Sequence, residues 1–502
     1  MIEEREVKEI VRAVLGSMSD DQLSEAFGTQ AAQAGSGSGA STGAVGRTDA
    51  DESAAAGTGT GDRGVFLTMD QALSAARRAF SELSQTSLET RRKMIAAMRR
   101  VTAEHVEELS ALAARETGLG RAEDKVVKNL LAIHKTPGVE DLEPVSYTDD
   151  DGLTLTERAP YGVIGAITPS TNPTETVISN GIGMIAAGNS VVFNPHPSAA
   201  ACSRLAVSLL NEASVEVGGP ENVVATIREP TIGSATHMMH HDDVALLCVT
   251  GGPGVVKAAM QTTKKVIAAG PGNPPAVVDE TADIPKAARD IVQGASLDNG
   301  IICTDEKEVL AVSSIADELK AEMKKHAALE LNAEQIRSVT ELVISDPGRE
   351  GHEGAPNKKY VGKNAADIAE AIGLHAPSDT RLLLCEVNAD HPLVWTEQLM
   401  PVLPLVRFGH VDEAIDFGVR CEHGFRHTAS MHSRNIDKLS AMAKKMNCSL
   451  YVKNGANFNG LGEGGAGYAS FTIASPTGEG FTRPRTFTRE RRCTLVGAFR
   501  IV

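Results

Sequence analysis

The sequence predicts an α/β protein with two parallel β-sheets, each covered by helices. Short apolar runs bounded by Gly, Pro or Asn alternate with stretches of helical periodicity, and this alternation occurs in two successive series. The composition agrees with this prediction, because 42% apolar and 23% charged residues are typical of a globular protein. A chain of 502 residues has room for about two to four packed units.

Charge and cysteine content exclude several classes of protein. The 49 basic and 65 acidic residues give a formal net charge of −16, which repels phosphate backbones and anionic lipid. We therefore expect no nucleic-acid partner and no membrane association. No run approaches the roughly 18 apolar residues of a membrane helix, and the acidic N-terminus does not match a secretion signal. Seven cysteines without clustered spacing predict reduced thiols in a cytoplasmic protein.

The N-terminal region is predicted to be an amphipathic helix, residues 1–18, on a flexible linker, residues 19–64. Apolar side chains in the helix recur at spacings of three and four. The stretch 28–64 contains 10 Gly and 9 Ala, and Val45 is its only large apolar side chain, too little to offset the entropy of ordering. Such a helix must dock on its own body, on another copy or on another protein, and the length of the tether favours an external partner.

The body of the chain begins with helices and continues with alternating strands and helices. Amphipathic runs predict helices at 72–80, 91–118 and 125–135. The first series of predicted strands covers 161–168, 189–195, 222–227, 245–251 and 275–279, and the second covers 308–313, 341–345, 381–387, 403–408, 427–433 and 449–454. Ligands of open α/β sheets bind beyond the carboxyl ends of the strands, which directs attention to the loops 168–173, 194–197 and 250–254.

One glycine motif near the start of the body carries no weight. Gly59-x-Gly61-x-x-Gly64 matches the dinucleotide-binding fingerprint letter for letter. No strand precedes it, and it lies in low-complexity sequence, so we discard it.

The cysteines differ in their local context. Cys248 and Cys385 lie inside apolar runs that predict buried strands, and a packing or surface role is expected for the others except Cys303: Cys202, Cys421, Cys448 and Cys493. Cys303 follows the turn Asp298-Asn299-Gly300 and precedes a predicted strand, and a loop can present a thiol to a cleft between two sheets. Context alone leaves both a catalytic and a packed structural thiol open for Cys303.

Seven stretches of the body resemble the aldehyde dehydrogenase superfamily, and specifically its CoA-acylating branch of bacterial microcompartments, the propionaldehyde and acetaldehyde dehydrogenases. They are 168–182 (TPSTNPTETVISNGI), 189–199, 249–256, 268–284 (AAGPGNPPAVVDETADI), 295–309 (ASLDNGIICTDEKEV), 396–405 and 472–493. The resemblance implies a Rossmann-type NAD-binding domain over 65–269, a catalytic domain over 270–482, and a small β oligomerisation element made of a hairpin at 144–160 and a strand at 483–502. It also implies a homodimer or homotetramer.

The resemblance implies that Cys303 is the nucleophile. A thiolate adds to an aldehyde carbonyl, and the tetrahedral adduct passes hydride to NAD and leaves a thioester. The developing oxyanion needs hydrogen-bond donors, and the family pattern assigns this role to the side-chain amide of Asn172 and to the backbone N–H of Cys303. Without the family resemblance, a turn residue before Pro173 is the preferred interpretation of Asn172.

The most informative feature is an absence. Hydrolytic members of the family carry a glutamate, in a Glu-Leu-Gly-Gly pattern, that activates water to cleave the thioester. The corresponding segment here, residues 268–273, reads AAGPGN and has no carboxylate. Water needs such a base, whereas the CoA thiol, with a pKa near about 8.5, needs much less help. The resemblance therefore predicts acyl-CoA as the product.

The cofactor residues are likewise implied by the resemblance. The expected NAD contacts are Thr168, Pro169 and Ser170 beside the nicotinamide, Gly251 and Gly252 at the pyrophosphate, and Glu397 at the nicotinamide ribose. Where hydrolytic members have a lysine at the adenosine ribose, this chain has Asn194-Pro195-His196-Pro197. Either Asn194 or His196 is expected to contact that ribose, or CoA in the same site.

No metal site is predicted. His237, His240, His241 and Asp242 have spacings compatible with metal ligands, but they end a helix and precede a strand. A solvated turn with cations at a helix C-terminus explains them equally simply.

The sequence thus predicts an NAD-dependent, CoA-acylating dehydrogenase that converts propionaldehyde to propionyl-CoA within a bacterial microcompartment. Residues 1–18 resemble encapsulation peptides, so a shell protein is the expected partner of the helix. Two alternatives stay open. One is the acetaldehyde enzyme of the ethanolamine type, and the other is an inactive dehydrogenase fold that binds the shell. Alkylation of Cys303 by iodoacetamide, with protection by NAD or aldehyde, separates the second alternative from an active enzyme.

Overall fold

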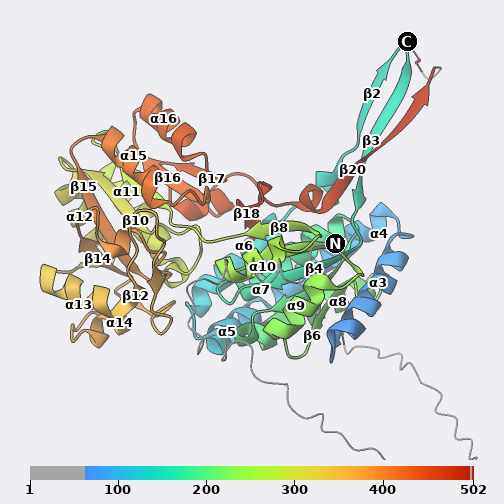
Figure 1. The fold of residues 1–502 in the computed structure, drawn as a ribbon, viewed down its shortest axis with the longest axis horizontal. Helices are drawn as coiled ribbons and strands as arrows, with labels where there is room; N and C mark the ends of the chain where they lie inside the picture. The colour runs from blue at the N-terminus through green and yellow to red at the C-terminus, as the bar shows by residue number, and fades with distance from the viewer. Residues whose placement is uncertain (1–62, 498–499, 502) are drawn as a thin grey trace, which may run out of the picture. The chain divides into compact units, whose positions relative to one another are not determined.

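A computed structural model describes residues 63–497, 500 and 501 (Figure 1). The predicted helix at 1–18 and nearly all of the linker at 19–64 lie outside these residues. Among the described helices, none combines the length and the apolar character that a membrane crossing requires.

The first sheet is parallel and has six strands in the order β1-β6-β5-β4-β7-β8. Its strands are β1 (Val65–Phe66), β4 (Val163–Thr168), β5 (Ser190–Pro195), β6 (Val224–Ile227), β7 (Val244–Thr250) and β8 (Lys265–Ala269). The central strands β4, β5 and β6 are buried throughout, as expected for near-continuous apolar runs between two layers of helices.

Helices cover both faces of this sheet. Side chains of a strand alternate between its faces, and on β4 Ile164 and Ala166 join one apolar cluster while Val163 and Ile167 join another. The first cluster includes residues of α4 (Leu88–Glu104), α5 (Val106–Thr117), α6 (Ala122–Lys135), α7 (Pro173–Ala186) and α8 (Ala200–Glu216). The second includes residues of α3 (Met69–Leu83), α9 (Ile232–His240) and α10 (Pro253–Met260).

The second sheet is also parallel and has seven strands in the order β11-β14-β15-β10-β9-β16-β17. Its strands are β9 (Pro275–Val278), β10 (Glu308–Val312), β11 (Ala328–Glu330), β14 (Leu382–Glu386), β15 (Val402–Phe408), β16 (Thr428–His432) and β17 (Leu450–Lys453). Both faces of β9 and β10 contribute to one apolar cluster with α11 (Ile284–Ser296), α12 (Ala316–Lys324), α15 (Val411–Cys421) and α16 (Ile436–Met446). Leu383 and Cys385 of β14 belong to another cluster, with α13 (Ala333–Val343) and α14 (Ala365–Ala371). The predicted α/β fold with two parallel sheets is confirmed.

Two predicted elements have different boundaries in the structure. The prediction of a strand at 341–345 is wrong for its first three residues, which end α13. A capping box between Asn332 and Gln335 starts this helix, and Val339 and Val343 are buried on one face of it, so packing outweighs the β-propensity of the run. Only Ile344–Asp346 forms a strand, β12, which pairs with β13 (Ala355–Pro356). The predicted helix at 91–118 is divided at His105 into α4 and α5.

A third, antiparallel sheet contains β2 (Val145–Asp149), β3 (Gly152–Pro160) and β20 (Thr488–Val496). Figure 1 shows the three strands side by side, and residues of β2 and nearly all of β20 are exposed. The structure therefore brings the predicted hairpin at 144–160 into one sheet with residues 488–496 of the predicted strand at 483–502, whereas Pro484–Phe487 form a 3-10 helix.

The chain returns to the first sheet after β17. Leu461, Phe471, Ile473 and Phe487 belong to the apolar cluster of α4, α6, α7 and α8. The segment contains η5 (Asn457–Leu461), the paired strands β18 (Ile473–Ala474) and β19 (Gly480–Phe481), and η6 (Pro484–Phe487). The predicted boundaries at 269/270 and 482/483 stay a prediction, but the packing of this segment belongs to the first sheet.

Candidate active site

Three of the predicted ligand loops meet at one edge of the first sheet. β4 lies between β5 and β7, and all three strands run in the same direction. Thr168 pairs with Pro195, and Ile167 pairs with both Asn194 and Val249, so the strands end at the same level. The loops at 168–173, 194–197 and 250–254 therefore lie at a common carboxyl edge, where ligands of such sheets bind.

Cys303 lies in a turn between η3 (Leu297–Gly300) and β10. The three residues Asp298, Asn299 and Gly300 have φ values of 49°, 59° and 70°, a left-handed conformation that Asp, Asn and Gly tolerate best. Tertiary bonds hold this turn, because Asn299 Nδ2 donates to the carbonyl of Gly362 at 2.9 Å. The backbone path that delivers the thiol is thus fixed by contacts from elsewhere in the chain.

Side chains on both sides of Cys303 fix the loop further. Lys307 Nζ donates to the carbonyls of Gly300 at 2.8 Å and Ile302 at 3.1 Å. Asp305 Oδ2 accepts the N–H of Ile302 at 3.1 Å. Both Lys307 and Asp305 are buried, so these hydrogen bonds hold the backbone of the loop from its buried side.

The thiol of Cys303 is neutral at rest. Burial, and after it the charge of Glu397, raise its pKa to about 12, although Lys307 and the cysteine's own N–H act to lower it. The residue is half-buried, whereas Cys202, Cys248, Cys385 and Cys421 are buried. Burial of Cys248 in β7 and Cys385 in β14 confirms their prediction as core residues. A neutral thiol needs a base before it can attack a carbonyl.

A carboxylate does reach the segment 268–273. Glu397 Oε1 accepts the N–H of Gly272 at 3.2 Å. Burial and the charge of Glu353 raise the pKa of Glu397 to about 7, although Lys307 lowers it. The expectation that no carboxylate is available holds for the side chains of the segment and is wrong for the space around it. No local pattern connects the two residues, because 125 positions separate Gly272 and Glu397, although the family resemblance implied that Glu397 lies at the nicotinamide ribose.

His427 is a neighbour of Cys303 that sequence analysis missed. A Cβ atom on Gly272 would lie 2.7 Å from the carbonyl oxygen of Cys303 and 3.0 Å from Cγ of His427, so these three residues pack closely and require glycine at 272. His427 Nδ1 is 2.8 Å from Thr428 Oγ1, and the buried Nε2 has no hydrogen-bond partner. Burial lowers the pKa of His427 to about 4, so its imidazole is neutral. The position of His427 at the start of a predicted strand gave no indication that it lies in the site.

Asn172 occupies the N-cap position of the buried helix α7. Its carbonyl accepts both the N–H of Thr176 at 3.1 Å and the hydroxyl of Thr176 at 2.6 Å, which fixes the backbone. The side chain does not cap the helix, and its Nδ2 makes a bond of 3.3 Å to Thr171 Oγ1. One N–H of the amide is therefore left for a ligand.

Features of the predicted cofactor residues fit a nucleotide. The buried Oγ1 of Thr168 has no hydrogen-bond partner, and Pro169 and Ser170 beside it are half-buried. Gly252 is the N-cap of α10, and a Cβ there would meet no atom within 4 Å, so the backbone at this helix start is open to a ligand. An unpaired donor and an open helix N-terminus are the features that a dinucleotide uses.

The structure separates the roles of Asn194 and His196. Asn194 is buried, its Oδ1 accepts the hydroxyl of Ser234 at 2.6 Å, and its Nδ2 donates to the carbonyl of Thr231 at 3.5 Å. It therefore anchors the start of α9. His196 is exposed, and its Nδ1 contacts Ser198, so its other ring nitrogen faces solvent. Of the two residues, His196 is the better placed for a ribose or for CoA.

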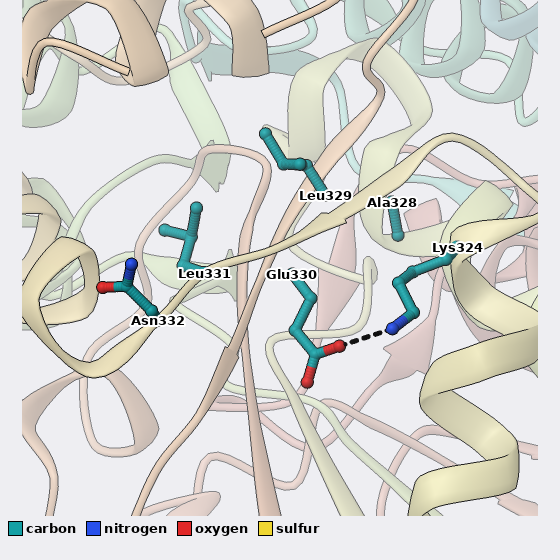
Figure 2. Close-up of a pocket in the computed structure, with 6 residues that line it drawn as sticks. All are labelled: Lys324, Ala328, Leu329, Glu330, Leu331 and Asn332. Carbon is teal, nitrogen blue, oxygen red and sulfur yellow. Dashed lines mark hydrogen bonds and ion pairs between the residues drawn. The ribbon is translucent and has the colours of Figure 1, made fainter. Parts of the chain in front are cut away.

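Neither the histidine cluster nor a surface hollow along β11 includes Cys303 or Asn172. His237 and His241 approach Asp70 of α3, with Nε2 atoms 2.7 Å and 3.4 Å from its Oδ1, and neither His240 nor Asp242 joins them. Figure 2 shows a hollow along the edge strand β11, where Lys324 Nζ is 2.7 Å from Glu330 Oε2. None of the predicted site residues lines this hollow.

Comparison with known proteins identifies the fold. Residues 64–471 match the model of the aldehyde dehydrogenase family. The chain belongs to this family. It is 50% identical to the acetylating acetaldehyde dehydrogenase EutE of Salmonella typhimurium, over 88% of this chain and 94% of that protein. It is 45% identical to the CoA-propanoylating propanal dehydrogenase of Citrobacter freundii, over 87% and 94%.

A solved structure supports the same assignment. The chain resembles the propionaldehyde dehydrogenase of Rhodopseudomonas palustris with bound CoA and an acylated cysteine, with a TM-score of 0.85 and 47% identity, over 88% of this chain and 100% of that one. The predictions of an aldehyde dehydrogenase fold and of a CoA-acylating enzyme are confirmed. The roles of individual site residues stay predictions.

Proposed function

We propose that this aldehyde dehydrogenase oxidises propionaldehyde with NAD and transfers the acyl group from Cys303 to CoA. The observation that carries the proposal is the half-buried Cys303 thiol beside the segment 268–273, whose own side chains include no carboxylate that could activate water. CoA brings its own nucleophile, a thiol with a pKa near about 8.5, and thioester exchange is nearly balanced in energy.

In the first half of the reaction the protein must create and stabilise charge. The neutral imidazole of His427, with its free Nε2, is the group we assign to take the proton of the Cys303 thiol. The thiolate then adds to the carbonyl carbon of the aldehyde, and the free N–H of the Asn172 amide and the N–H of Cys303 bind the oxyanion. NAD, when bound, supplies the hydride acceptor that converts this adduct to a thioester.

The cofactor would be held by backbone and a few side chains. Thr168 offers an unpaired hydroxyl, Gly252 an open helix N-terminus, and Glu397 a carboxylate for ribose hydroxyls. Between the two halves His427 releases the first proton to solvent. In the second half His427 takes the proton of the CoA thiol, the sulfur of CoA attacks the thioester carbon, the bond to Cys303 breaks, and the released cysteine thiolate recovers the proton from His427. The same imidazole then serves both halves.

The test is the requirement for CoA. With propionaldehyde and NAD alone, we expect a burst of about one NADH per active site followed by slow turnover, and addition of CoA should restore sustained NADH formation with propionyl-CoA as product. Glu397, with its pKa of about 7 and its bond to the N–H of Gly272, is the carboxylate whose assistance to water this assay tests. Equal turnover with and without CoA, and propionate as product, would overturn the acylating assignment.

Acetaldehyde is a second candidate substrate, favoured by the 50% identity to the acetylating EutE. One methylene changes discrimination by only about 1 to 3 kcal/mol, so both aldehydes are expected to react. The ratio of kcat/KM for the two aldehydes decides between them.

We further propose that the helix at 1–18 directs the enzyme into a microcompartment, and that β2, β3 and β20 join subunits. The exposed apolar side chains of the third sheet, Val145, Tyr147, Leu495 and Val496, support the second proposal. Deletion of 1–18 should abolish encapsulation and leave kcat unchanged; a loss of kcat would contradict this. Sedimentation should give a dimer or tetramer, and a monomer would contradict the role of the sheet.

A further inference from the structure

Four charged side chains form a buried cluster beside the nucleophile loop. Lys125 and Lys128 come from α6, Glu175 from the first turn of α7, and Asp298 from η3. Lys125 Nζ lies 2.8 Å from Asp298, and Lys128 Nζ lies 2.5 Å from Asp298 and 3.2 Å from Glu175. At most 2% of any of these side chains is exposed. Buried charges persist only when paired closely, so this cluster has little freedom to rearrange.

Lys128 also contacts the predicted oxyanion donor. Its Nζ donates to Oδ1 of Asn172 at 2.7 Å. An ammonium group has hydrogens and no acceptor, so it can face only the oxygen of the amide. The orientation of the Asn172 carboxamide is therefore set, and its Nδ2 must point away from Lys128. With one N–H near Thr171 Oγ1 at 3.3 Å, the second N–H is held ready for a ligand.

The same lysine holds the other side of the oxyanion site. Asp298, its ion-pair partner, has a left-handed conformation and lies in the turn that leads to Cys303. Burial works to lower the pKa of Lys128, but the charges of Asp298 and Glu175 outweigh it and raise this pKa, so the side chain stays an ammonium. Lys128 thus links helix α7, which carries the amide donor, to the turn that carries the backbone donor.

We propose that Lys128 is a positioning residue of the oxyanion site, which orients the Asn172 amide toward the carbonyl oxygen of the aldehyde bound to Cys303. This inference rests on the proposed function, in which Asn172 and the N–H of Cys303 bind that oxygen. Pre-oriented donors stabilise a transition state without a cost of reorganisation at the moment of reaction. A disordered amide would have to be aligned in each turnover.

Lys125 provides a matched control. It lies one turn away on the same helix, is fully buried, and pairs with the same Asp298, but its hydrogen bonds do not include Asn172. A Lys125→Met variant therefore removes an ion pair of the same cluster and leaves the amide in place. If the cluster only stabilises the fold, replacing either lysine should have the same effect on the catalytic rate. If Lys128 orients the Asn172 amide, only replacement of Lys128 should lower the catalytic rate.

The experiment measures the single-turnover burst of NADH with propionaldehyde and NAD, without CoA. The amplitude of the burst counts competent active sites, and its rate constant reports the step in which the oxyanion develops. We expect Lys128→Met to lower the rate constant about tenfold to a hundredfold with little change in the KM for NAD, and Lys125→Met to change it by less than about threefold. Thermal unfolding of both variants compares their stabilities.

A double variant separates action through Asn172 from independent effects. If Lys128 acts by orienting the amide, Lys128→Met should slow an Asn172→Ala enzyme by no more than about twofold, because no amide remains to be oriented. Equal burst rates for Lys128→Met and Lys125→Met, or full additivity in the double variant, would overturn the proposal. Because the burst needs no CoA, failure of the acylating function would appear separately, as sustained turnover of the unmodified enzyme without CoA.

Discussion

The nucleophile loop and the cofactor loops are held in different ways. Around Cys303 the backbone is fixed by buried side chains: Lys307 and Asp305 bond to main-chain atoms of the turn, and Asn299 bonds to the carbonyl of Gly362. At the carboxyl edge of the first sheet, Gly252 is open to solvent and Thr168 keeps an unpaired hydroxyl. Buried side chains thus hold the backbone of the nucleophile loop, whereas the cofactor loops leave a hydroxyl and a helix N-terminus available to a ligand.

This difference follows from the chemistry that each end performs. An oxyanion must meet donors that are already aligned, since a displacement of about 1 Å can cost a hundredfold in rate. The cofactor end must accept NAD and then CoA, two ligands that share an adenosine and differ elsewhere. Backbone groups and a few hydroxyls suit both ligands, because they impose little shape of their own.

The largest expected effect is at the nucleophile loop around Cys303. Cys303→Ala should lower the rate of NADH formation by at least about a thousandfold, because no other described thiol lies in this loop. Steady-state assays with propionaldehyde, NAD and CoA measure it. Cys493→Ala, at the exposed thiol of β20, serves as the control and should stay within about twofold. A comparable loss of activity in both variants would contradict the role of Cys303 as the nucleophile.

An intermediate effect is expected at Glu397, which is a predicted NAD contact and whose charge also acts on Cys303. Its charge raises the pKa of the Cys303 thiol, so Glu397→Gln should lower that pKa and speed alkylation by iodoacetamide about threefold to tenfold at pH 8. With a pKa of about 7, Glu397 is mostly protonated at pH 6, so the two enzymes should react more alike there. Mass spectrometry of the labelled peptide measures the rate. A difference that is largest at pH 6 would contradict the sign of this interaction.

The smallest effect is expected in the cofactor loops at the carboxyl edge of the first sheet. His196→Ala should raise the KM for NAD or CoA about threefold and leave kcat unchanged, because one exposed hydrogen bond is lost. Asn194→Ala should instead lower the melting temperature, since Asn194 anchors the start of α9 through Ser234 and Thr231. Initial rates and thermal unfolding separate the two. A fall in kcat for His196→Ala would contradict the distinction between the cofactor loops, which are expected to affect KM, and the nucleophile loop, which is expected to affect kcat.

Patterns that are local in the sequence predicted most of the fold. The apolar runs of β4, β5, β10 and β15 are buried strands as expected, and Cys303 lies in a loop, as the turn before it indicated. The run at 341–345 failed because helix capping and burial outweighed the preference of Val and Ile for strands.

The site required information that no local pattern carries. Lys128 stands in an amphipathic helix and has the sequence signature of a solvated charge, yet it contacts Asn172, 44 positions away, and Asp298. Glu397 reaches Gly272 across 125 positions. The family resemblance indicated which residues to examine, but only the folded chain shows that Asn194 is buried and bonded to Ser234 of α9, while His196 is exposed.

The return of the chain to the first sheet after β17 affects the order of assembly on the ribosome. Phe471, Ile473 and Phe487 complete a core whose other members are synthesised hundreds of residues earlier. The sheet that is translated second can therefore finish before the sheet that is translated first. Until the last segment emerges, the nascent polypeptide exposes apolar surface, which makes it a client for chaperones late in translation.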